Sequence, residues 1–110
     1  MKITYCNNKL AKSFEDFKGL KKRIDNNLIE KIKFYYNVML CSSTFNDFLN
    51  TGIDHPERLS NSNRRIWSLR LNANVRLIIE LENFDPCLSE TVKIKGVCDY
   101  HGGKNNWYIS

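Results

Sequence analysis

The sequence has no long apolar run. No stretch approaches the roughly 18 consecutive apolar residues that suggest a membrane-spanning helix, and the opening residues MKITYCNNK contain no apolar core of the kind found in signal peptides. No internal repeat or linker divides the 110 residues, so we expect a single domain over 1–110. We therefore expect a cytoplasmic protein without a membrane segment.

The sequence also lacks a cysteine pattern that would bind a metal. Its four cysteines are Cys6, Cys41, Cys87 and Cys98, and their spacings of 35, 46 and 11 match no zinc pattern and include no C-x-x-C. We expect reduced thiols in a cytosolic protein, with no metal and no cofactor. A zinc site built on Cys98 and His101 is the less favoured alternative.

The chain does carry an excess of positive charge. Lys and Arg number 17 against 12 Asp and Glu, which gives a net charge of +5. Such a balance favours an anionic partner, either nucleic acid or an acidic protein. One basic cluster, at residues 18–23, could contact such a partner, or it could be the solvated end of a helix, where cations are stabilising in any case.

The clearest pattern is an alternation of apolar and polar residues from Ile66 to Glu82. It predicts two strands with one buried face and one wet face. A three-residue loop at 72–74 pairs Leu69 with Leu77 and keeps the apolar residues on one face, whereas a two-residue loop would mix core with surface. Asparagines in this loop tolerate the left-handed conformation that such turns need.

This register places Arg70 directly opposite Arg76 on the wet face. Like charges at opposed positions destabilise a strand pair. We therefore expect compensation by a carboxylate such as Glu80 or by a phosphate from outside the protein. The simpler alternative is two solvated arginines on a sheet surface.

Helices are expected before this hairpin and one strand after it. Apolar residues recur at helical spacing from Leu28 to Leu40. In the final strand a bulge at Gly96 would break the alternation of core and surface residues. The tail GGKNNWYIS at 102–110 is expected to be partly flexible, although Trp107 and Tyr108 could pack against the domain. The order β-α-α-(α)-β-β-β predicts an α+β fold, with two to three N-terminal helices packed on a small twisted antiparallel sheet. The expected elements are a strand at 2–5, helices starting near 8, 26 and 44, loops over 51–63 and 83–90, and a strand over 91–100.

The run WSLRLNANVRLI at 67–78, followed by DYH at 99–101, resembles the HigB branch of the RelE/ParE toxin superfamily. These are small bacterial toxins of type II toxin–antitoxin modules. The opening ITYCNNKLAK resembles the first strand and helix start of that family. The resemblance implies a RelE-like fold, endonucleolytic cleavage of mRNA on the ribosome and a cognate HigA-like antitoxin with a helix-turn-helix. It implies no cofactor.

The resemblance also points to particular site residues. Arg76 matches the family's strand arginine, and Arg70 matches a basic position one strand earlier. His101 matches the terminal histidine, with Tyr100 and Asp99 beside it.

RNA cleavage by the 2′-hydroxyl needs a base, an acid and positive charge on the phosphorane. Imidazole titrates near neutrality, and guanidinium groups bind phosphate with two parallel bonds. Our hypothesis is that Arg76 stabilises the transition state, that His101 is the general acid or base, and that Arg70 and Arg65 position phosphates. Tyr100 would stack on a base or orient His101, and Asp99 would orient the imidazole. Tyr100 could equally belong to the core.

The segment before the hairpin departs from the family pattern. HPER at 55–58 resembles the family's H-x-L-K or H-P-L-K segment, with His55 as the histidine and Arg58 in place of the lysine. An alternative alignment matches Leu59 with the family's leucine and puts Ser60 where the lysine is expected. The further candidates for phosphate binding are Arg64, Arg65, Lys93 and Lys95.

Two other functions stay open at this point. The same fold could inhibit a protein target, as the ParE branch does with gyrase, or it could be an inactive RNA-binding or regulatory module. His101 together with the paired arginines favours the nuclease, whereas the missing lysine near Ser60 favours the inactive module.

Overall fold

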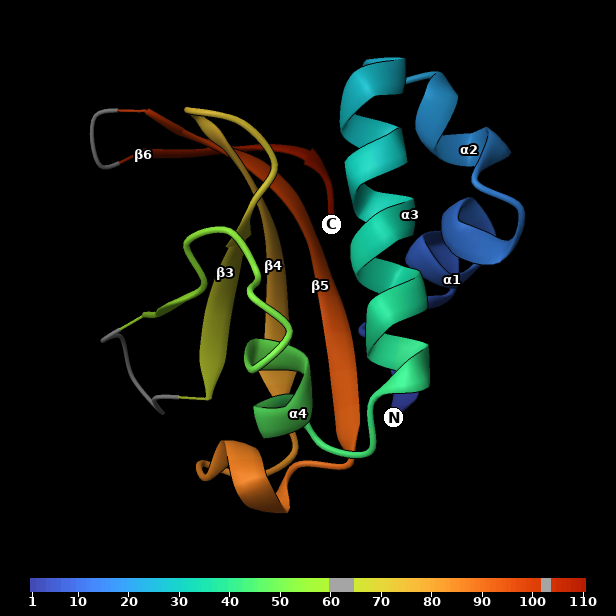
Figure 1. Ribbon diagram of the computed structural model, residues 1–110. Helices are drawn as coiled ribbons and strands as arrows, with labels where there is room; N and C mark the ends of the chain where they lie inside the picture. The colour runs from blue at the N-terminus through green and yellow to red at the C-terminus, as the bar shows by residue number, and fades with distance from the viewer. Residues whose placement is uncertain (60–64, 102–103) are drawn as a thin grey trace.

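The chain forms an α+β fold, and in the part that the structure describes four helices precede most of the strands. The computed structural model describes residues 1–59, 65–101 and 104–110, with the backbone alone for 100, 101, 104 and 105. Figure 1 shows the helices between residues 8 and 41 on one side of the sheet, as the alternation in the hairpin predicts. Within the described ranges, no helix has both the length and the apolar character needed to cross a bilayer.

The helices that start at Asn8 and Phe45 each follow a polar residue whose side chain accepts a hydrogen bond from a free backbone N–H group. The Asn7 side chain accepts a hydrogen bond from the backbone of Leu10, and Thr44 forms a capping box with Asp47. The first helix ends earlier than the predicted Gly19, because Phe17 adopts a left-handed conformation (φ 62°). The helices are α1 (Asn8–Glu15), α2 (Lys18–Lys21), α3 (Asn26–Cys41) and α4 (Phe45–Leu49).

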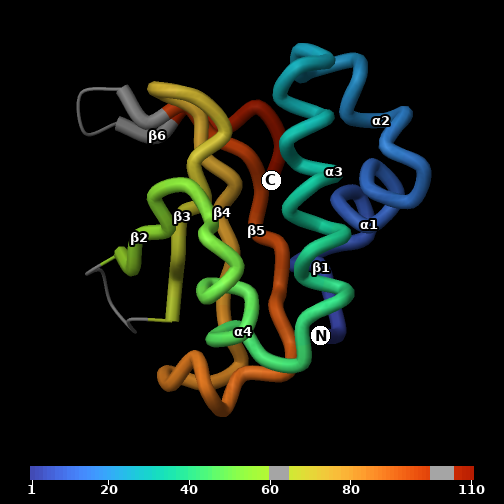
Figure 2. Tube along the Cα trace, in the orientation of Figure 1, coloured from blue at the N-terminus to red at the C-terminus, as the bar shows by residue number. Residues whose placement is uncertain are grey.

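The prediction of an antiparallel sheet is wrong, because the sheet is mixed. Strand β1 lies parallel to β5, and the other strand pairs are antiparallel. The helices between β1 and β5 supply the long connection that a parallel pair requires. The strand order is β1-β5-β4-β3-β2, and β6 pairs with β5 (Figures 1 and 2). The strands are β1 (Lys2–Tyr5), β2 (Glu57–Arg58), β3 (Ile66–Arg70), β4 (Val75–Leu81), β5 (Thr91–His101) and β6 (Lys104–Ile109), with a 3-10 turn, η1 (Pro86–Leu88), before β5.

Two strands lie where the sequence predicted loop or flexible tail. The two-residue β2 falls in the expected loop over 51–63 and pairs with β3. The tail forms β6, which pairs with the last part of β5 and buries Ile109. Both are edge strands that depend on pairing with a single neighbouring strand.

The predicted hairpin register is confirmed. Leu69 pairs with Leu77 and Arg70 pairs with Arg76, and the loop occupies 72–74. The side-chain oxygen of Asn72 accepts hydrogen bonds from the backbone N–H groups of Asn74 and Val75. The turn is therefore closed by an asparagine, as the sequence suggested.

A bulge in β5 changes which residues face the helices. Ile78 pairs with Gly96 and Ile79 pairs with Ile94, so one extra residue of β5 is accommodated between them. Gly96 has a φ of 149°, a backbone conformation suited to glycine. As a result Val97, rather than Cys98, joins the core.

The core lies between the helices and one face of the sheet. Trp67 belongs to it, as predicted, together with the stripe of α3 that includes Ile29, Ile32, Tyr35 and Met39. We call the opposite face of the sheet the open face. It is not wholly wet, because Ser68, Ile78 and Cys98 are buried there. Its residues on β3, β4 and β5 include Ser68, Arg70, Arg76, Ile78, Glu80, Lys93, Gly96 and Cys98.

Candidate nucleic-acid interface

Two arginines lie side by side on the open face, at the turn end of the β3–β4 hairpin. Arg70 and Arg76 are directly paired positions. The Arg76 guanidinium donates to the backbone oxygens of Asn72 (2.7 Å), Val75 (3.1 Å) and Ala73 (3.4 Å). Carbonyl oxygens fix the position of this guanidinium without neutralising its charge. Among the described residues, no carboxylate forms an ion pair with either arginine.

Glu80 does not compensate the arginine pair. Its carboxylate lies 3.6 Å from Arg65 and 3.9 Å from each of Lys93 and Lys95. Glu80 is four residues from Arg76 along β4, which corresponds to about 13 Å of strand. The open face thus has two separate cationic centres, the arginine pair and a second centre of three cations around one carboxylate.

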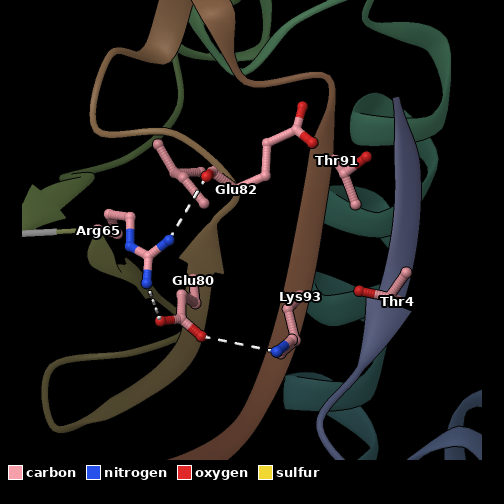
Figure 3. Close-up of a pocket in the computed structure, with 7 residues that line it drawn as sticks. Thr4, Arg65, Glu80, Glu82, Thr91 and Lys93 are labelled. Atoms are coloured by element: carbon pink, nitrogen blue, oxygen red, sulfur yellow. Dashed lines mark hydrogen bonds and ion pairs between the residues drawn. The ribbon is translucent and has the colours of Figure 1, made fainter.

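The second centre borders a pocket of about 270 Å³ that opens between β1, β4 and β5. Figure 3 shows the Glu80 carboxylate between Arg65 and Lys93, with the threonines on the far wall. The lining residues are Thr4, Arg65, Glu80, Leu81, Glu82, Thr91 and Lys93. Arg65 also donates to the backbone oxygen of Glu82 at 3.5 Å, which ties it to this end of the hairpin. The structure therefore brings Arg65, Lys93 and Lys95 together, but away from Arg70 and Arg76.

A histidine held by a carboxylate lies in the loop before β2. His55 Nδ1 is 2.5 Å from the Asp54 carboxylate, and its side chain is largely exposed. The φ of His55 is 47°, an uncommon conformation for a residue with a side chain. Lys31 of α3 pairs with Asp54 at 3.6 Å. The hydrogen bond with His55 lowers the pKa of Asp54, helped by the charges of Lys31 and Arg70. The imidazole and its carboxylate thus lie within electrostatic reach of Arg70.

Arg58 does not join either cationic centre. It pairs with Trp67 across β2 and β3, on the side that faces the helices. Its guanidinium stacks between two rings, 5.1 Å from the centroid of Trp67 and 4.3 Å from that of Phe84, and it donates to the Phe84 oxygen at 3.2 Å. These contacts indicate a packing role at the edge of the sheet.

The last part of β5 brings the DYH run to the arginine pair. Cys98 is directly opposite Arg76, and the strand continues to His101. Asp99 pairs with Val75 instead, and its carboxylate accepts a hydrogen bond from the Tyr108 hydroxyl at 3.4 Å. The side chains of Tyr100 and His101 lie outside the described residues, as do Ser60 and Arg64 entirely, so their roles stay predictions.

The cysteines offer no nucleophile at the arginine pair. All four are free thiols, and Cys98 is buried. Burial raises the pKa of the Cys98 thiol to about 11, and the neighbouring charge of Asp99 adds to the rise. The thiol is therefore protonated at neutral pH. Within the described ranges, no group of three or more His, Cys, Asp or Glu residues is placed to hold a metal ion.

Sequence reasoning missed two contributors to this site. Asp54 stands next to His55 in the chain, so an orienting carboxylate could have been suspected from adjacency. Lys31 carries no such signal, because α3 meets the loop only in the folded protein.

Comparison with known proteins identifies no relative, so the inference of function rests on the fold and on the geometry of the site. No family model, curated protein or solved structure matches the chain.

Proposed function

We propose that this protein is an endoribonuclease of the HigB-like toxin type that cleaves mRNA on the ribosome without a cofactor. The observation that carries the proposal is the pairing of Arg70 with Arg76 beside the strand that ends in DYH. Two arginines at paired strand positions, with no carboxylate paired to them among the described residues, are suited to a phosphate whose charge grows in the transition state.

In the proposed reaction the 2′-oxygen attacks the adjacent phosphorus and its proton passes to a base. The bond from phosphorus to the 5′-oxygen breaks, and the leaving oxygen takes a proton from an acid. The products are a 2′,3′-cyclic phosphate and a 5′-hydroxyl. Arg76 and Arg70 stabilise the phosphorane, and His101 transfers one of the protons. His55, whose Nδ1 faces the Asp54 carboxylate, is suited to the other transfer through its Nε2.

Primer-extension mapping of transcripts after induction tests this proposal. The intact protein is expected to produce cuts within translated messages. Arg76→Ala is expected to lower the cleavage rate about 10²–10³-fold, as loss of one transition-state donor typically does. His101→Ala is expected to abolish the cuts.

Lys12→Ala is the matched control, because Lys12 is an exposed basic residue of α1 on the helical side of the molecule and lies outside the 18–23 cluster. It should leave the cuts unchanged. Undiminished cleavage by both Arg76→Ala and His101→Ala would remove the basis of the proposal.

A second candidate is the same fold binding RNA without cutting it. The three carbonyl contacts of the Arg76 guanidinium favour it, because a phosphate must compete with them. This candidate predicts crosslinking of the protein to transcripts without new 5′ ends.

A toxin of this type requires a partner that covers its active face, so we also propose a HigA-like antitoxin with a helix-turn-helix and a cytoplasmic location. The net charge of +5 would steer an acidic partner toward this chain. Coexpression with the adjacent open reading frame should yield a complex that no longer cleaves RNA. Independent purification of the two products would count against this pairing.

A further inference from the structure

We propose that the open face is a continuous track for single-stranded RNA, in which a base stacks on Trp107 between the two cationic centres. The inference rests on the proposed function only in taking RNA as the ligand, and it concerns binding rather than cleavage. It adds an aromatic platform and a second phosphate site to the arginine pair.

The two cationic centres lie on one face and along one line. Arg76, Ile78 and Glu80 alternate with core residues of β4, so they point to the same side of the sheet. The spacing from Arg76 to Glu80 is about 13 Å, from four residues of strand. A nucleotide chain must therefore span several residues of β4 to contact both centres.

Trp107 lies beside this line. In the sheet Trp107 pairs with Cys98, which in turn pairs with Arg76, so the indole comes from two strands away on the same face. Two strand spacings correspond to about 10 Å. The ring lies against Gly96, since a Cβ added there would be 2.9 Å from Cζ3 of Trp107. Gly96 is the partner of Ile78, midway between the two centres.

Exposure distinguishes this indole from the other tryptophan. Trp107 is 44% exposed, whereas Trp67 is 8% exposed and belongs to the core. Ile78 and Cys98 are buried on the open face, so the indole, not the sheet beneath it, is what a ligand would meet there. An exposed aromatic ring flanked by cations is the arrangement by which proteins bind single strands with little sequence preference.

The second centre can accept a phosphate while keeping its carboxylate. Lys93 and Lys95 each lie 3.9 Å from Glu80, beyond hydrogen-bond distance, so both ammonium groups keep donors for a further oxygen. Both lysines reach the same carboxylate oxygen, so they stand side by side on this face. An acidic protein partner would also bind these cations. It would not explain the exposed indole that lies between the two cationic centres.

The test uses a 2′-O-methyl RNA of about ten nucleotides, a length within the range that single-strand-binding modules cover. This probe lacks the attacking hydroxyl, so binding is measured apart from cleavage. Fluorescence anisotropy at low salt gives the affinity, and tryptophan emission reports on the indole. Binding should quench the emission of the unmodified protein, and Trp107→Phe should remove that quenching while keeping most of the affinity. Trp107→Ala should weaken binding at least tenfold.

Charge reversal tests the second centre. Lys93→Glu with Lys95→Glu should weaken binding of the ten-nucleotide probe at least tenfold and leave binding of a dinucleotide unchanged. The matched control is Lys9→Glu with Lys12→Glu, an equal charge change at exposed residues of α1, on the helical side and outside the 18–23 cluster. The control should change the affinity less than twofold, and circular dichroism should show both double variants folded.

Three results would overturn the track. They are an unquenched indole in the bound complex, an equal loss of affinity in the control variant, and equally tight binding and quenching by poly-glutamate. The track and the proposed nuclease can fail separately. Binding of the probe as expected, with intact transcripts in cells, would remove the nuclease alone. Cleavage that is indifferent to Trp107, Lys93 and Lys95 would remove the track alone.

Discussion

At the scale of single residues, Tyr35 links the helical layer to the hairpin that carries the arginine pair. It is fully buried in α3, and its hydroxyl donates to the backbone oxygen of Arg70 at 2.5 Å. Burial raises the pKa of Tyr35 to about 12, and the charge of Asp54 adds to the rise. The neutral phenol is therefore part of what holds β3 against the core.

Replacing Tyr35 by Phe should lower the free energy of unfolding by about 1–2 kcal/mol at pH 7, because the Arg70 oxygen loses a buried donor. The pH dependence has a definite sign. The unfolded chain loses the Tyr35 proton near pH 10 and the folded chain near 12, so the contribution is complete below pH 10 and is lost as pH rises to 12.

Urea unfolding between pH 7 and 11 checks this prediction. The difference between the intact protein and Tyr35→Phe should be constant up to pH 10 and shrink above it. A difference that grows with pH would contradict the assignment of a raised pKa.

Individual side-chain contacts were predictable only where the local pattern fixed them. The opposition of Arg70 and Arg76 followed from the alternation of apolar residues, because a shift of one residue would have exposed the core. The link from Lys31 to Asp54 and His55 did not follow, since it depends on how α3 packs against a loop. The stacking of Arg58 between Trp67 and Phe84 was missed for the same reason.

At the scale of elements, the bulge at Gly96 sets the boundary between the core and the open face on β5. A Cβ at this position would lie 2.3 Å from the backbone oxygen of Ile109 and 2.9 Å from Cα of Ser110. Neither atom can move without shifting β6. The glycine therefore lets β6 pair closely with β5.

Gly96→Ala should lower the free energy of unfolding by about 2–5 kcal/mol, from backbone strain at positive φ together with the clash against β6. The control is Gly52→Ala, because Gly52 also has a positive φ (83°) but has no atom within 4 Å of an added Cβ. It should cost only about 1 kcal/mol. Urea midpoints measure both, and equal losses would show that the approach of β6 is unimportant.

The type of most elements was readable from the sequence, but the neighbours of the edge strands were not. Periodicity and capping residues located α3, α4 and the β3–β4 hairpin. The pairing of β1 with β5 is parallel because of the path of the chain through the helices, which local pattern does not encode. Strand β6 was missed because NNWYI lacks a clean alternation and gains its stability from the edge of β5.

At the scale of the whole molecule, one core joins the helical layer to the sheet. The cluster of buried residues includes side chains from α1, α3 and α4 and from β3, β4, β5 and β6. The Cα radius of gyration is 12.9 Å, close to the roughly 13 Å expected for a compact domain of this length. Such a core should unfold as one unit.

Calorimetry should therefore give a single transition with an enthalpy of about 75 kcal/mol at the midpoint, from about 0.7 kcal/mol per residue. The calorimetric and van't Hoff enthalpies should agree. Two resolved transitions, or a van't Hoff enthalpy far below the calorimetric value, would show that the helices and the sheet unfold separately.

The parallel pairing of β1 with β5 also has a consequence for the order of events during synthesis. Ile3 leaves the ribosome well before its partner Val92, which lies 89 positions later in the chain. Strand β1 must therefore wait, without its neighbour, until β5 has emerged. A nascent chain can form its helices and the hairpin earlier, but the sheet that orders both cationic centres on one surface closes only after β5 has been synthesised.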